Sequence, residues 1–280
     1  MAYGARVIAD SISEAGARLT TLEVTLPRIV LAEFNTHRVF SRNSASSRAI
    51  PVAKQIERIR TDPFIPFYWG ANQSGMQAAR ELTGYERDQA ESEWLSARDN
   101  AIAHVEQLLA LGLHKQISNR LLEPFMWQTI LVTATEWSNF YALRINAQAQ
   151  PEIRRAAELM HEAQAASTPQ LVAQGEWHLP LIQPDEEDWA RKHPEVAVKI
   201  SAGRCARVSY LTHDGVRDHD KDIELCERLA SSGHMSPLEH VATPIVQEPS
   251  TDLCFFGNFR GWMQFRKTIE GEDDFSKLSH

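Results

Sequence analysis

The sequence has few cysteines and no long apolar run. Its three cysteines, Cys205, Cys226 and Cys254, form no CxxC pair and cannot all pair with one another. Such sparse usage fits a reducing compartment. No run approaches the roughly 20 apolar residues of a membrane span, and the N-terminus lacks the apolar core of a signal peptide. We therefore expect a cytoplasmic protein.

Several common motifs and an excess of positive charge are also missing. The chain has no GxGxxG, no P-loop and no GxSxG, so Rossmann, Walker-type and serine-hydrolase sites have no support. Its formal charge of −8 argues against a nucleic acid or membrane surface as partner, because both need a basic face. The 280 residues, with 43% hydrophobic content, are ordinary for a globular protein of one large or two small domains.

The N-terminal region predicts two strands and a short helix. Residues 5–31 contain two strand-like apolar segments separated by a turn. Pro27 should end the second strand, because it has no N–H to donate to a neighbouring strand. We expect the next residues to form a short helix that delivers residues 36–38 to a pocket.

The middle of the chain predicts helices and then a linker. Apolar residues recur every three or four positions from Trp94 to Leu109, which predicts a helix over residues 86–111 with Gly112 as a C-cap. We predict a second helix over about 126–143 and a third over 151–167, which begins at a proline. Residues 167–190 are proline-rich and turn-like, so we expect a linker there.

The C-terminal region is less regular. Residues 197–211 are ambiguous between strand and helix entry, whereas residues 221–240 predict a helix stopped by Gly233 and Pro237. The layout of residues 243–269 loosely repeats that of residues 21–42, with an aromatic and basic segment after a strand-like one. This repetition hints at a duplicated strand-helix unit.

Arginine, histidine and serine residues are concentrated in residues 36–48, THRVFSRNSASSR. Arginine can bind phosphate oxygens bidentately, and serine hydroxyls with backbone N–H groups can complete such a site. His37 could stack on a planar ring. The same composition is also common in solvated, helix-capping loops, so the residue types alone leave both interpretations open.

Two other segments have a chemical and a structural interpretation. Arg144 follows an apolar turn and could stabilise negative charge on a pyrimidine ring, or it could form a surface pair with Glu152. Residues 233–240, GHMSPLEH, suggest metal ligands, but their spacing is not HExxH and no third ligand is evident. We favour a charged loop there and predict no metal site.

These segments together resemble the flavin-dependent thymidylate synthases. The family signature RHRxxSxNxxSxR matches at six of seven specified positions, and Thr36 replaces its first arginine. Residues 94–124 are similar to the family's helix that leads to a phosphate-binding arginine, here Arg120. Residues 139–153 are similar to its NFxxLR segment, which places the catalytic arginine at Arg144. Residues 205–210 and 229–240 resemble its ARVS and HxSPxEH motifs.

The resemblance implies an α+β fold with a central antiparallel sheet and long helices, as a single domain over residues 1–280. In the usual enzymes the ARVS and HxSPxEH motifs precede the signature, whereas here they follow it. The chain therefore resembles a circularly permuted member. The family also implies a homotetramer with flavin and nucleotide sites shared between subunits.

The activity implied by the resemblance is transfer of a one-carbon unit from methylenetetrahydrofolate to C5 of dUMP, giving dTMP, with FAD reduced by NADPH. The catalytic residue would be Arg144, which would also bind the substrate. The FAD site would contain Thr36, His37, Arg38, Asn139, Ser209, His234 and Ser236. The dUMP site would contain Glu33, Ser44, Ser46, Ser47, Arg48 and Arg120.

The sequence departs from the family at some of these positions. Glu33 stands where a glutamine is frequent, Ser44 replaces a glutamate and Gln148 replaces a histidine. The segment before Asn139 also lacks the family's Asn-x-Arg. Two alternatives therefore stay open: methylation or hydroxymethylation of another pyrimidine nucleotide, and a nucleotide-binding protein without catalysis.

Overall fold

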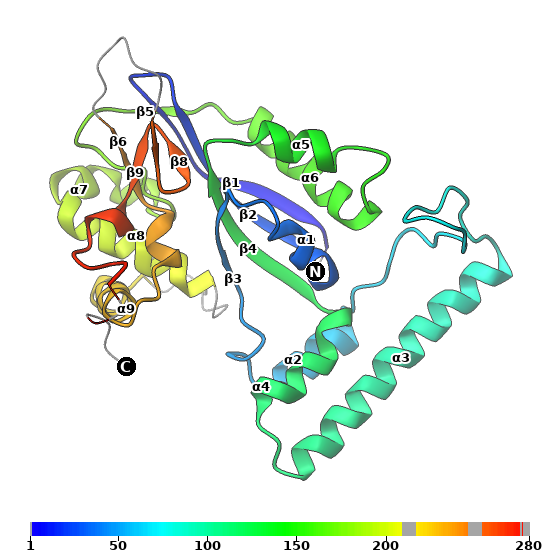
Figure 1. The fold of residues 1–280 in the computed structure, drawn as a ribbon. Coiled ribbons are helices and arrows are strands. Elements are labelled where there is room, and N and C mark those ends of the chain that lie inside the picture. Colours follow the sequence, from blue (N-terminus) through cyan, green and yellow to red (C-terminus); the bar gives the residue numbers. More distant parts are fainter. Residues whose placement is uncertain (1, 209–216, 246–253, 275, 277–280) are drawn as a thin grey trace.

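The computed structural model describes residues 2–208, 217–245, 254–274 and 276. Its centre is a five-stranded sheet of order β3-β4-β2-β1-β5 (Figure 1). The bounds are β1 Gly4–Ser13, β2 Arg18–Pro27, β3 Ser41–Ser44, β4 Trp127–Ala134 and β5 Gln170–Val172. The first four pair antiparallel, and β5 pairs with β1 in parallel. The predicted α+β class with a mostly antiparallel central sheet is confirmed.

The predicted strand pair at the N-terminus is confirmed. β1 and β2 form a hairpin whose turn contains Gly16 at a φ of 81°, a conformation that glycine adopts without steric cost. β2 ends at Pro27, as predicted. The 3-10 helix η1 (Arg28–Val30) and the helix α1 (Leu31–Phe34) follow it, which confirms the short helix.

The helix predicted over residues 126–143 is wrong. That stretch forms β4, a break and then α5 (Ser138–Arg144). β4 lies between β2 and β3, and its residues 130–134 are buried. A strand buried on both faces has a nearly continuous apolar run, which periodicity cannot distinguish from a buried helix. Its many β-branched residues favour the strand.

Helices cover the sheet on both faces (Figure 1). α5 and α6 (Pro151–Ala165) pack on the face formed by Leu22, Val24, Ile130 and Val132. α8 (Pro194–Val208) packs on the opposite face, where Cys205 and Val208 belong to a cluster with Leu131. Residues 197–208 of the segment left ambiguous by its sequence are therefore helical.

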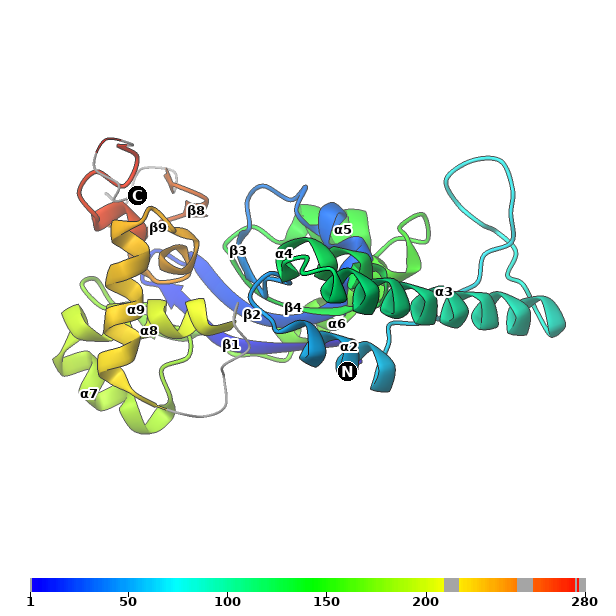
Figure 2. The ribbon, with the colours of Figure 1, turned by 90° about the horizontal axis from the view of Figure 1, so that it is seen from below.

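A separate helical layer extends from one end of the sheet. It consists of α2 (Val52–Thr61), α3 (Tyr85–Ala110), α4 (Lys115–Ser118) and the 3-10 helix η2 (Asn119–Phe125). Figure 2 shows α3 as a long arm that reaches beyond the sheet. The helix predicted over 86–111 is confirmed, and Gly112 follows its C-cap with a φ of 81°.

The C-terminal part forms a compact unit beside β1 and β3. Its helices are η3 (Pro184–Glu186), α7 (Glu187–Lys192), α8, α9 (His219–Ser231), η4 (Ser236–Glu239) and η5 (Phe265–Thr268). Its short strands are β6 (Ala242–Pro244), β7 (Phe255–Phe256), β8 (Phe259–Arg260) and β9 (Trp262–Gln264). α8 and α9 approach closely at Gly203, where a Cβ atom would lie 2.2 Å from the Asp222 carbonyl oxygen. The helix predicted within 221–240 is confirmed as α9, which ends before Gly233.

The stretch predicted as a linker, residues 167–190, contains β5, η3 and the start of α7. Its residue His178 forms a backbone bridge with Ala242. The linker and the single domain over 1–280 stay predictions. No helix in the described part of the chain has the length and apolar character needed to cross a membrane.

A buried chain of hydrogen bonds joins the sheet to the C-terminal unit. His178 contacts Ser11 through Nδ1 and Thr21 through Nε2, each at 2.7 Å. The hydroxyls of Thr21 and Thr133 also lie 2.7 Å apart, and Thr133 contacts Nδ1 of His240 at the same distance. Burial lowers the pKa of both histidines to about 3, so both are neutral near pH 7.

Candidate active site

The signature segment bends from α1 into the edge strand β3. The backbone N–H of His37 donates to the carbonyl of Phe34, and β3 then pairs with β4 from Ser41 to Ser44. His37 is buried, whereas its neighbours Thr36 and Arg38 are exposed. The segment therefore presents two polar side chains outward, one on each side of a fixed imidazole.

Two signature residues bind the C-terminal unit. The Asn43 side-chain amide donates to the Cys205 carbonyl at 2.7 Å, and the Gln264 amide donates to the Ser41 hydroxyl at 2.8 Å. Gln264 also donates to the Glu239 carbonyl at 3.4 Å, at the end of the GHMSPLEH segment. The signature and that segment, which lie far apart in sequence, therefore meet in the fold.

A first polar cluster surrounds Arg144, the last residue of α5. Its Nε donates to Nε2 of His37 at 3.0 Å, its Nη2 to the Thr36 hydroxyl at 3.5 Å, and its Nη1 lies 3.6 Å from a Glu33 carboxylate oxygen. The ring of Phe140 packs edge-on against His37 at 4.8 Å between ring centroids. Four residues that the sequence singled out thus meet here.

The imidazole of this cluster is uncharged at neutral pH. Burial, followed by the charges of Arg144 and Arg42, lowers the pKa of His37 to about 4. Its Nε2 can then accept the hydrogen bond from Arg144. The guanidinium of Arg144 is therefore held in place by a hydrogen bond to an uncharged imidazole.

A second polar cluster has Glu123 at its centre. One carboxylate oxygen of Glu123 accepts hydrogen bonds from the Ser47 hydroxyl at 2.8 Å, Arg120 at 2.7 Å and Arg28 at 3.3 Å. The Asn119 amide donates to the carbonyls of Ser47 and Ile50. These contacts fix the loop that ends the signature beside the predicted phosphate-binding arginine.

Sequence reasoning missed three members of the second cluster, namely Arg28, Asn119 and Glu123. One signal was available, because Arg120 and Glu123 stand three residues apart in a helical turn. The contact between Glu123 and Ser47 spans 76 residues and leaves no local signal. Within the described part of the chain, no hydrogen bond or ion pair joins the first cluster directly to the second.

The side chains of the remaining predicted site residues that the structure describes make no hydrogen bond or ion pair with either cluster. Three of them have exposed side chains that make no hydrogen bond or ion pair with any described residue, namely Arg38, Arg48 and Asn139. His234 contacts the Ser232 hydroxyl at 3.0 Å, and Ser236 begins η4. Ser44 and Ser46 are half-buried. Ser209 lies outside the described residues.

The comparisons with known proteins point to one family. The family described as thymidylate synthase complementing protein matches residues 17–170, which include the signature, both clusters and α5. No curated protein sequence matches the chain.

Two solved structures are similar to the chain, both of the UMP/dUMP methylase PolB from Streptomyces cacaoi. The one bound with 5-Br dUMP has a TM-score of 0.44 and 15% identity over 59% of this chain and 90% of that chain. The one bound with 5-Br UMP has a TM-score of 0.46 and 18% identity over 59% and 89%. The match of the family over residues 17–170 covers more than half of the chain.

Proposed function

Because the chain belongs to the thymidylate synthase complementing protein family, we propose that it transfers a one-carbon unit from methylenetetrahydrofolate to C5 of dUMP, giving dTMP. FAD would be the cofactor and NADPH the reductant. The observation that supports this proposal best is the pairing of Arg144 with a neutral His37, because it leaves a permanent cation available for an electron-rich ring.

Arg144 would bind the pyrimidine and stabilise its charge. A uracil that loses its N3 proton carries negative charge, and arginine stays protonated at any working pH. The contacts of Nη1 with Glu33 and of Nη2 with Thr36 are 3.6 and 3.5 Å long, so they are weak. Both nitrogens can therefore exchange these contacts for a ligand at little cost, while the bond from Nε to His37 keeps the guanidinium in place.

The residues present fit an FAD molecule. A dinucleotide diphosphate needs cationic and amide donors, and Arg38 and Asn139 offer both without a competing partner among the described residues. The further proposed FAD contacts are Thr36, His37, His234, Ser236 and Ser209. When bound, FAD supplies the redox chemistry of the transfer, and the protein supplies position and charge.

The second cluster would bind the phosphate of dUMP. Glu123 accepts hydrogen bonds from Arg120 and Ser47, and Asn119 donates to the Ser47 carbonyl. These contacts hold the loop of residues 46–48 beside Arg120, so binding of the phosphate would require little further ordering of the loop. Arg48 is exposed and can reach a phosphate as the loop's own cation. Glu33 and Ser44 complete the proposed substrate contacts.

The test is flavin oxidation that depends on dUMP. The protein reconstituted with FAD and reduced should be reoxidised, without oxygen, by dUMP together with methylenetetrahydrofolate, and the nucleotide product should be dTMP. Arg144→Ala should lower the rate by at least about 100-fold, the size of effect expected when a charge-stabilising donor is lost. Arg191→Ala removes an exposed arginine from α7 and should leave the rate unchanged. A protein that takes up no FAD would overturn the proposal.

The threonine at position 36 supports a second candidate. Its hydroxyl donates to the Glu33 carbonyl at 2.7 Å and faces Arg144, where the family has an arginine. The change removes a cationic donor from the proposed FAD site and from beside Arg144. The second candidate is therefore methyl or hydroxymethyl transfer to another pyrimidine nucleotide. Mass analysis of the nucleotide product separates the two reactions. Binding of dUMP without any uptake of FAD would instead indicate a nucleotide-binding protein without catalysis.

A further inference from the structure

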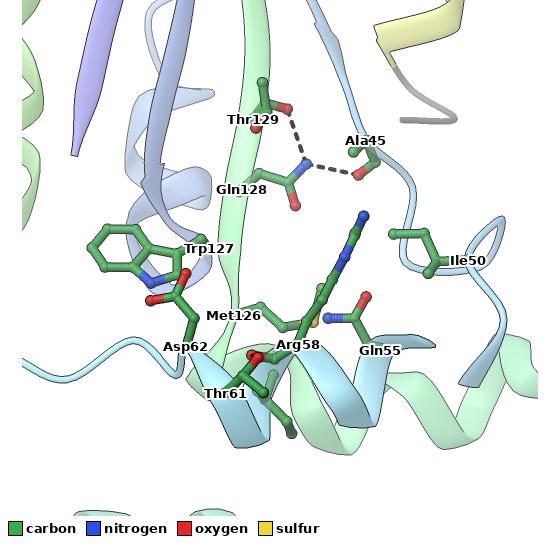
Figure 3. A pocket seen from close by; sticks show the side chains of 11 residues that line it. Ala45, Ile50, Gln55, Arg58, Thr61, Asp62, Met126, Trp127, Gln128 and Thr129 are labelled. Atoms are coloured by element: carbon green, nitrogen blue, oxygen red, sulfur yellow. Dashed lines mark hydrogen bonds between the residues drawn. The ribbon is translucent and has the colours of Figure 1, made fainter. Parts of the chain in front are cut away.

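A cavity lies beside the signature loop and belongs to neither polar cluster. It has a volume of about 180 Å³ and lies between α2, the start of β4 and residues 45–50 (Figure 3). Ala45 and Ile50 form its wall toward the signature loop, and Met126 and Ile59 add further apolar surface. The cavity thus shares its wall with the proposed dUMP loop.

Arg58 points into this cavity from α2. Figure 3 shows its guanidinium extending between Gln128 and Ile50. The guanidinium makes no hydrogen bond or ion pair with any residue that the structure describes. Burial lowers the pKa of this guanidinium, but an arginine remains charged in proteins. An arginine that is partly removed from water without a counter-charge is costly unless a ligand supplies the charge.

Two further polar groups at the cavity lack a partner. Gln55 is only 2% exposed, and its Oε1 has no hydrogen-bond partner. Rotation of this amide can present either its oxygen or its NH2 group to a ligand. The indole Nε1 of Trp127 is also buried without a partner. Native proteins leave few such atoms unsatisfied, so their presence at one cavity points to a missing ligand.

Asp62 also lines the cavity but does not neutralise Arg58. No ion pair joins the two residues, and Figure 3 shows the Asp62 carboxylate turned toward Trp127 and away from the guanidinium. The end of the cavity that contains Arg58 and Gln55 therefore has a net positive charge and hydrogen-bonding groups. The rest of its wall combines apolar side chains with the polar residues Thr61, Gln128 and Thr129.

We propose that this cavity binds the oxyanion of a ligand, a phosphate or a carboxylate, with Arg58 as the binding cation and Gln55 as a hydrogen-bonding partner. Every ligand of the proposed reaction carries such a group: dUMP, FAD and NADPH carry phosphates, and the folate carries carboxylates. A dUMP phosphate bound in this cavity would replace the second cluster as its binding site. Arg58 and Gln55 lie outside the signature and outside every set of site residues assigned above. The site goes beyond the proposed function, because it requires neither flavin nor turnover.

The first experiment uses inorganic phosphate and the full-length protein. Saturating phosphate should raise the melting temperature of the wild type by at least about 2 °C relative to chloride at equal ionic strength. Arg58→Met should abolish this rise and weaken phosphate binding by about tenfold or more. Arg58→Lys keeps the charge without the planar fork and should retain a smaller rise.

Lys54→Met is the matched control, because Lys54 is an exposed cation one turn earlier on α2. It should keep the full response to phosphate. An unchanged response in Arg58→Met, or an equal loss in Lys54→Met, would overturn the proposal.

Calorimetric titrations of dUMP and of tetrahydrofolate then identify the source of the anion. Weaker binding of dUMP alone in Arg58→Met assigns the cavity to the nucleotide phosphate, and weaker binding of tetrahydrofolate alone assigns it to a carboxylate. If the variant loses the phosphate response but binds both ligands normally, the site takes either a dinucleotide phosphate or a free anion. Titrations of FAD and of NADPH distinguish these two, because only a dinucleotide site weakens in Arg58→Met. A wild type that responds to phosphate but binds no dUMP would contradict the proposed function and leave the site intact.

Discussion

At the residue scale, the pair of His37 and Arg144 shows how burial decides a protonation state. His37 is 8% exposed and lies against Phe140, so charging its ring would require removing a cation from water beside another cation. The neutral ring in turn accepts a hydrogen bond from Arg144. The position of the guanidinium therefore depends on His37 staying uncharged.

We expect an NMR titration of the His37 ring to give a pKa of about 4, well below the ordinary value of 6.5. Arg144→Gln removes one of the lowering charges, so the pKa of His37 should rise. It should stay below 6.5, because burial is the larger cause and remains in the variant. Arg191→Gln should leave the titration unchanged. A wild-type pKa near 6.5, or a full return to 6.5 in Arg144→Gln, would contradict this account.

The sequence predicted part of the site at this scale. The signature spacing and the NFxxLR segment singled out His37 and Arg144, which the fold brings into contact. Glu123 could not be found in this way, because its partner Ser47 is distant in sequence and a lone glutamate in a helical turn is common. Asn43 was matched only as a signature residue, yet its amide fixes α8 against the sheet.

At the element scale, the strand β4 shows where local pattern fails. Its sequence WQTILVTA is apolar at consecutive positions because β4 lies between two strands and beneath helices on both faces. Only its pairing partners decide that it is a strand. The hairpin of β1 and β2 was predictable, because the buried residues Leu22, Val24 and Leu26 alternate with more polar ones and Pro27 marks the end.

The buried histidines that join β2 and β4 to the C-terminal unit should make stability depend on pH. His178 and His240 have pKa values of about 3 when folded and about 6.5 when unfolded. As the pH falls from 6.5 toward 3, the unfolded chain binds protons that the folded chain does not. The free energy of unfolding should therefore fall by up to about 1.4 kcal/mol per pH unit for each histidine.

Urea unfolding at several pH values between 7.5 and 4.5 measures this slope. His178→Gln removes one titrating ring and should reduce the slope, although it also lowers stability at pH 7.5 by disturbing the contacts with Ser11 and Thr21. His104→Gln removes an exposed histidine on α3 and should leave the slope unchanged. An identical slope in the wild type and His178→Gln would rule out this role for His178.

At the scale of the whole molecule, segments distant in sequence come together around β3. Gln264 of β9 donates a hydrogen bond to Ser41 of this edge strand. The same amide donates to Glu239, so it links the GHMSPLEH segment to β3. A circularly permuted chain would need the same meeting of its first and last parts, and the permutation itself stays a prediction. The family order of motifs could be compared from the sequence, but the contacts of Ser41 and Asn43 required the fold.

The long helix α3 is mostly exposed. Of its 26 residues, only Ile102 and Val105 are buried, although the sequence predicted an apolar stripe over residues 94–109. Large apolar side chains also remain exposed near its C-terminal end, where Leu111 is 84% and Ile117 is 54% exposed. A group of large exposed apolar side chains near one helix end is typical of a surface that binds another protein.

We predict that this end of α3 packs against a second copy of the chain in the proposed homotetramer. Leu111→Glu combined with Ile117→Glu would place charges in the contact and should shift the protein to a smaller species in light scattering coupled to size exclusion. The loss in affinity should be at least about tenfold, since burying an unpaired carboxylate is costly. Met76→Glu alters a fully exposed loop residue and should leave the mass unchanged. A monomeric wild type, or an unchanged mass in the double variant, would exclude this interface.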